Sequence, residues 1–181
     1  MAKLQLTVAV NLHGLRKFKG VLESTDLRTS EAAPIREALV KWGDLITNYL
    51  TKRWQIFSMG GGNWTALNAK YKAWKVRKGF LPFILRMTDQ ALSLFWIDFS
   101  RKPGALNEDI KFGVRIGFGE AMQVPHMTNP QMTVASIMML HQQGVGKLPQ
   151  RKVIVGPDTA TRGKMRDVMD RALKKVARGE S

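Results

Sequence analysis

The chain has 181 residues, of which 44% are apolar, and its 29 basic and 14 acidic residues give a formal net charge of +15. This apolar content excludes intrinsic disorder for most of the chain. The absence of cysteine excludes disulfides, thiolate metal sites and cysteine nucleophiles. The start of the chain does not suit a signal peptide, and no uncharged apolar run could span a membrane. We therefore expect a single domain over residues 1–181, with no membrane partner.

The first third of the chain predicts a strand and two helices. Residues 3–11 alternate apolar and polar side chains, the period of a half-buried strand. Residues 12–27 form a short amphipathic stretch that is expected to be helical. A long helix is expected near residues 31–57, because apolar side chains recur there at spacings of three and four. The glycine run in residues 58–63 should end this helix as a flexible loop.

The middle of the chain predicts a helix and a hairpin. Residues 64–78 have helical spacing, and residues 84–99 drift from helical spacing into a strand-like end. A turn at residues 101–107 is followed by clean alternation over residues 109–119. The two strands around this turn should form an antiparallel hairpin.

The last third predicts two helices separated by a fourth short strand. Asn129 and Pro130 are expected to begin an apolar helix over residues 130–143, which Gly144 ends in a left-handed conformation. Residues 152–155 read as the fourth strand, and Pro157-Asp158 begins the final helix. The sequence therefore predicts an α+β fold, with a small, mainly antiparallel four-stranded sheet packed against several helices.

The basic residues crowd two regions, 70–102 and 147–178. A surplus this large indicates a polyanionic partner, either nucleic acid or an acidic protein surface, although a solvated face that aids solubility is the alternative. Aromatic residues are interleaved with lysines in residues 64–78, but their helical spacing favours inward packing over base stacking. The candidates that would face DNA or an acidic partner are Lys70, Lys72, Lys75, Arg77 and Lys78.

No motif for catalysis or for a cofactor is present. The GVGK stretch at residues 144–147 resembles a phosphate-binding loop, but that motif would require glycine where His141 stands and a hydroxyl where Leu148 stands. Its order of helix, loop and strand is also the reverse of the motif. The three histidines lack zinc-ligand spacing, and Asp98 and Asp109 read as solvated carboxylates beside a turn. We therefore expect no enzyme, no metal and no cofactor.

One set of residues, in order and spacing, resembles the phage virion-morphogenesis or tail-completion proteins, over roughly residues 60–175. The set consists of Trp64, Leu67, Tyr71, Lys75, Ile84, Leu85, Thr88, Leu92, His141, Gly144, Pro149, Arg151 and Gly156. One departure is Asp89, where relatives have glycine, and this residue would let a helix start earlier. The resemblance implies a non-enzymatic structural protein of the virion neck, made in the host cytoplasm, that helps join tail to head.

The resemblance also implies partners. They are further copies of the chain in a homo-oligomeric ring, sixfold or twelvefold, the neighbouring head–tail connector, tail terminator and tail tube, and double-stranded DNA in the channel. The glycine loop and the methionine-rich helix are the candidates for subunit contacts, through Gly60, Gly61, Gly62, Met132, Met138 and Met139. The alternative function is a basic nucleic-acid-binding module without enzymatic activity. A hydrolase, the third possibility, lacks metal ligands.

Overall fold

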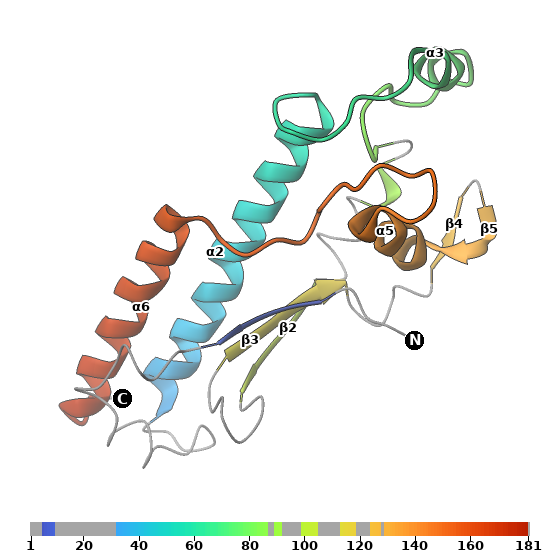
Figure 1. The fold of residues 1–181 in the computed structure, drawn as a ribbon. Helices are drawn as coiled ribbons and strands as arrows, with labels where there is room; N and C mark the ends of the chain where they lie inside the picture. Colours follow the sequence, from blue (N-terminus) through green and yellow to red (C-terminus); the bar gives the residue numbers. More distant parts are fainter. Residues whose placement is uncertain are drawn as a thin grey trace. The chain divides into compact units, whose positions relative to one another are not determined.

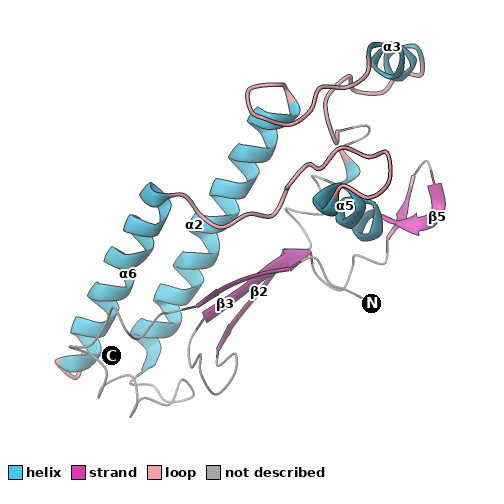
Figure 2. Ribbon diagram, in the orientation of Figure 1, coloured by secondary structure: helices cyan, strands magenta, loops and turns pink. Residues whose placement is uncertain are grey.

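The computed structural model describes most of the chain (Figures 1 and 2). The described residues are 5–9, 32–86, 89–91, 99–104, 113–118, 124–127 and 129–180. Their helices are α2 (Ala33–Ser58), α3 (Ala69–Arg77), α5 (Val134–Gln143) and α6 (Thr159–Ala177). Their strands are β1 (Gln5–Ala9), β2 (Phe99–Gly104), β3 (Gly113–Phe118), β4 (Pro125–His126) and β5 (Asn129–Thr133).

The predicted fold class is wrong, because the described residues are mostly helical and no four-stranded sheet forms among them. The strands β1, β3 and β2 lie side by side in that order, and β4 pairs with β5 in a separate antiparallel sheet. The expected fourth strand at residues 152–155 is irregular backbone. The backbone N–H groups of Val153 and Ile154 donate to the side chain of Gln142 instead of to a neighbouring strand.

The described chain divides into two compact units. One consists mainly of residues 48–100 and 117–155, and the other mainly of residues 6–47, 101–116 and 156–181. We call them the cleft unit and the helix-pair unit. Helix α2 contributes its first half to the helix-pair unit and its second half to the cleft unit. The single domain over residues 1–181 stays a prediction.

The helix-pair unit has a core between the first half of α2 and α6, which run alongside each other in Figure 1. Ile35, Leu39 and Ile46 of α2 are fully buried, as is Leu173 of α6. The indole Nε1 of Trp42 donates to the carbonyl of Met165 at 2.6 Å. The predicted start of the last helix is confirmed: the Asp158 side chain caps α6 by accepting from the N–H of Thr161.

The long helix predicted near residues 31–57 is confirmed by α2, which ends at Ser58 just before the glycine run. The helix predicted over residues 64–78 begins later, at Ala69, because the Asn68 side chain caps it by accepting from the N–H of Lys70. Trp64 and Leu67 therefore lie in irregular backbone before α3. The Thr65 carbonyl, which a longer helix would use internally, instead accepts hydrogen bonds from Arg151.

Two further boundaries differ from the prediction. Helix α5 begins at Val134 rather than at Pro130, because Thr133 caps it and residues 129–133 form β5. Its predicted end is confirmed, since Gly144 has φ 71°. Strand β2 runs through Pro103-Gly104, which were expected in a turn, and it neighbours β3. The helix expected over residues 12–27 lies outside the described residues, as does the segment 92–98.

Candidate functional site

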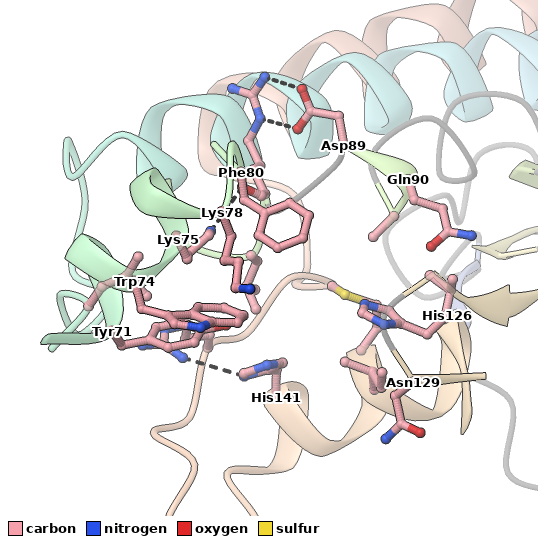
Figure 3. A pocket seen from close by; sticks show the side chains of 18 residues that line it. Tyr71, Trp74, Lys75, Lys78, Phe80, Asp89, Gln90, His126, Asn129 and His141 are labelled. Atoms are coloured by element: carbon pink, nitrogen blue, oxygen red, sulfur yellow. Dashed lines mark hydrogen bonds and ion pairs between the residues drawn. The ribbon is translucent and has the colours of Figure 1, made fainter. Parts of the chain in front are cut away.

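A cleft of about 560 Å³ lies within the cleft unit (Figure 3). Its walls come from α3 and the segment before it, from residues 80–86 and 89–91, from β4 and β5, and from α5 and the segment after it. The lining residues are Leu67, Tyr71, Trp74, Lys75, Lys78, Phe80, Leu85, Arg86, Asp89, Gln90, Ala91, His126, Asn129, Val134, Ile137, Met138, His141 and Arg151.

Lys75 is a buried cation that holds the loop after α3. Its side chain is 2% exposed, and its Nζ donates to the carbonyls of Phe83 at 2.7 Å and Arg86 at 3.1 Å. Burial lowers the pKa of Lys75, and the negative charge of Asp89 partly opposes that shift. The sequence predicted that Lys75 would face DNA or an acidic partner, whereas its ammonium group is buried against two backbone carbonyls. Its role in the structure is to hold the backbone of the loop.

Arg151 ties the segment after α5 to the segment before α3. Its Nη2 and Nε donate to the carbonyl of Thr65 at 3.0 and 3.3 Å, a contact between residues 86 positions apart. Its Nη1 lies 3.4 Å from Nδ1 of His141. Burial lowers the pKa of Arg151, but arginine keeps its charge in proteins. Arg151 is 5% exposed, and its guanidinium group joins two distant segments.

His141 is a neutral imidazole at neutral pH. Burial and the nearby charge of Arg151 lower its pKa from 6.5 to about 4. With Nδ1 facing a guanidinium donor, the ring acts as the acceptor. Burial also lowers the pKa of His126, which belongs to β4 and is labelled in Figure 3.

The corner that follows α5 is built from hydrogen bonds. The carbonyl of His141 accepts from the backbone N–H of Arg151 at 2.7 Å, which closes the GVGK stretch into a loop. The Gln142 amide mimics a strand edge, because its Nε2 donates to the Ile154 carbonyl while its Oε1 accepts from two backbone groups. A Cβ on Gly144 would lie 2.8 Å from Cβ of Gln150, so this position requires glycine for both space and φ.

Arg86 and Asp89 form a bidentate ion pair, with both nitrogen–oxygen distances at 2.6 Å. The hydrogen bond to Asp89 raises the pKa of Arg86. Asp89 has φ 56°, a conformation that favours glycine. The expectation that aspartate would let a helix start earlier is therefore wrong: the left-handed turn is present, and Asp89 occupies it with its side chain held by Arg86.

Aromatic rings form the α3 side of the cleft. Tyr71 and Trp74 are stacked, with ring centroids 5.4 Å apart and an angle of 15°, and Phe80 lies 5.9 Å from Trp74. Tyr71 is 45% exposed, which corrects the expectation that it packs inward. Trp64 does pack inward, with its ring edge-on to Phe57, and the guanidinium group of Arg53 lies over the Phe57 ring.

The structure brings six of the thirteen resemblance residues to this cleft. Leu67, Tyr71, Lys75, Leu85, His141 and Arg151 line it, and Gly144 and Pro149 lie in the adjoining corner. Trp64 is buried beside Phe57, Ile84 is buried, and Gly156 is exposed with open space around it. Thr88 and Leu92 lie outside the described residues.

The other candidates occupy varied positions. Lys70, Lys72, Arg77 and Lys78 are exposed, as predicted for a basic stripe on α3. Met138 is 2% exposed and so is already covered within its own unit, while Met132 and Met139 are half-buried. In the glycine loop, Gly62 lies against Phe57, since a Cβ there would contact the ring. The interface role of these residues stays a prediction.

Sequence reasoning missed several lining residues. Phe80, Arg86, Gln90, His126 and Ile137 carry no motif, and their segments meet only through tertiary contacts. The Gln90 amide, for example, accepts from the N–H of Met127 and donates to the carbonyl of Pro125, about 35 residues away. The weak signal was the position of Arg86 three residues before Asp89.

Comparisons with protein-family models, with curated proteins and with solved structures find no match. In the part of the chain that the structure describes, no three side chains of His, Asp or Glu are grouped to hold a metal ion. No helix of these residues is long and apolar enough to cross a membrane.

Proposed function

We propose that the chain is a non-enzymatic structural protein of a tailed-phage virion, a neck or tail-completion component. In this role it assembles as a ring with further copies of itself and contacts neighbouring connector, terminator and tail-tube proteins around the DNA channel. Its working surfaces are then contact surfaces, and its buried polar groups hold the shape of those surfaces.

The observation that carries the proposal is that six of the resemblance residues, from distant parts of the sequence, line one cleft. The side chains of Lys75 and Arg151, which are far apart in sequence, both donate hydrogen bonds to backbone carbonyls of neighbouring segments. Burial and the nearby charge of Arg151 keep His141 neutral, and its ring nitrogen faces the Arg151 guanidinium group. Groups used in this way position loops, which suits a protein whose role is assembly.

The test is deletion of the gene from the phage that carries it, followed by electron microscopy of the particles. We expect filled heads and separate tails, with joining restored by the intact gene supplied in trans. Normal infectious particles from the deletion would contradict the proposal. A second variant, Lys72→Glu, reverses an exposed charge on α3 and leaves Lys75, His141 and Arg151 unchanged. We expect it to impair the joining of heads and tails while the thermal unfolding temperature stays the same.

The second candidate, a nucleic-acid-binding module, is favoured by a specific observation. Helix α6 has seven exposed basic residues on or just after it: Arg162, Lys164, Arg166, Arg171, Lys174, Lys175 and Arg178. Such a concentration of exposed positive charge can bind phosphates irrespective of base sequence. Fluorescence anisotropy with duplex DNA at several salt concentrations separates the two functions. Tight, strongly salt-dependent binding by an isolated monomer would favour this candidate over the neck.

A further inference from the structure

The cleft has an excess of positive charge. Among its lining side chains are four cationic groups, those of Lys75, Lys78, Arg86 and Arg151, and one carboxylate, that of Asp89. The two lining histidines do not add charge at neutral pH, because burial lowers the pKa of both. The cleft therefore favours an anionic occupant.

Lys78 is the cation that remains available to such an occupant. Lys75 and Arg151 donate to backbone carbonyls, and Arg86 is paired with Asp89. The Lys78 side chain has no hydrogen bond or ion pair to any other described residue, and Figure 3 shows it extending into the cleft between Trp74 and Phe80. A carboxylate placed there would gain a partner without displacing one.

The walls next to Lys78 are apolar. The rings of Trp74 and Phe80 line the cleft beside it, and α5 contributes the apolar side chain of Ile137 to the lining. A wall of this kind binds aliphatic or aromatic side chains by burial of apolar surface. The matching ligand has a large apolar group next to a carboxylate, a combination that a peptide segment can provide.

A nucleic acid fits the cleft less well. Its affinity depends on many phosphate contacts, whereas the cleft offers one uncommitted cation among the described residues. One face of the Trp74 indole is already stacked on Tyr71, and the aliphatic wall on α5 offers no donors for base edges. These features favour a peptide over an oligonucleotide.

We propose that the cleft docks a segment of a neighbouring protein in which a large apolar or aromatic side chain stands next to an aspartate or glutamate. The carboxylate pairs with Lys78, and the apolar side chain packs against the apolar lining formed by Trp74, Phe80 and Ile137. The proposal rests on the assembly function given above and deepens it by naming the chemistry of the partner.

The test is selection of short random peptides displayed on yeast against the immobilised full-length protein. We expect enriched peptides to contain Asp or Glu within a few positions of Phe, Trp, Tyr, Leu or Ile. They should bind Lys78→Glu about tenfold more weakly, the scale of a charge pair that is partly desolvated. Lys70→Glu makes the same charge change on α3 outside the cleft and should bind like the wild type.

Ile137→Trp gives a second reading, because the larger side chain fills the cleft from its apolar wall, and we expect it to weaken the same peptides. Three results overturn the proposal: no enrichment, peptides without an acid, or equal binding to wild type and Lys78→Glu. Displacement of the peptides by oligothymidylate at matched ionic strength would identify nucleic acid as the occupant and also overturn it. Peptide binding is measured on the isolated protein, whereas the assembly function is tested by deletion of the gene in the phage. The failure of one proposal is therefore distinguishable from the failure of the other.

Discussion

The His141 imidazole should make the folded protein sensitive to mild acid. Its pKa is about 4 in the folded state and near 6.5 in an unfolded chain. Between these values the unfolded state binds more protons, so the free energy of unfolding falls as the pH is lowered. Linkage between the two pKa values gives a loss of about 2 kcal/mol from pH 7 to pH 5. Because the ring is partly exposed, we expect about 1 to 2 kcal/mol.

Urea unfolding followed by tryptophan fluorescence at pH 7, 6 and 5 measures this loss. Other groups titrate too, so the informative quantity is the difference between wild type and His141→Gln, whose side-chain oxygen can still accept from Arg151. We expect the variant to lose about 1 to 2 kcal/mol less than wild type over this range. His126→Gln is the matched control and should keep most of the pH dependence. Parallel pH profiles for wild type and His141→Gln would refute the reasoning.

Three further predictions concern stability, each measured by urea unfolding at neutral pH. Trp42→Phe should lower the free energy of unfolding by about 1 kcal/mol more than Trp64→Phe. The reason is that the Trp42 indole donates to a carbonyl, while Trp64 Nε1 has no acceptor among the described residues; equal losses would contradict this. Gly146→Ala should lower the free energy of unfolding by about 1 kcal/mol, through its positive φ alone. Gly144→Ala should lower it clearly more, because its Cβ would also contact Gln150; the reverse order would contradict the geometry of this corner. Asp89→Ala should destabilise by about 1 kcal/mol more than Asp89→Asn, which tolerates the left-handed backbone and keeps one acceptor for Arg86; no difference would remove the turn argument.

Local signals in the sequence predicted the helices with strong periodicity or strong end signals. The apolar spacing of α2, the aspartate before α6 and the glycine after α5 each act within a few residues, so the sequence specifies them directly. Boundaries were missed where a side chain competes with the helix for backbone groups. Asn68 and Thr133 both begin helices later than apolar spacing alone indicates, because each caps the first turn.

The sheet and the cleft depended on contacts that local patterns do not encode. Residues 152–155 have the composition of a strand, yet their backbone bonds with the Gln142 side chain. Lys75 reads as a surface lysine among other lysines, and only the loop that returns over it makes it buried. The resemblance named in advance about a third of the residues that line the cleft, but only the fold shows that Lys75 donates to backbone carbonyls of described residues while Lys78 does not.

The pairing of α2 with α6 has a consequence for synthesis of the chain. Trp42 and its acceptor Met165 are 123 residues apart, and the apolar side chains of the first half of α2 are buried in the same unit. A ribosome releases that half of α2 long before α6 has been synthesised. The apolar face of the helix is therefore exposed in the nascent chain until its packing partner appears. Production of this protein should therefore respond strongly to chaperone supply and growth temperature. Messages cut short before the final helix should yield insoluble product.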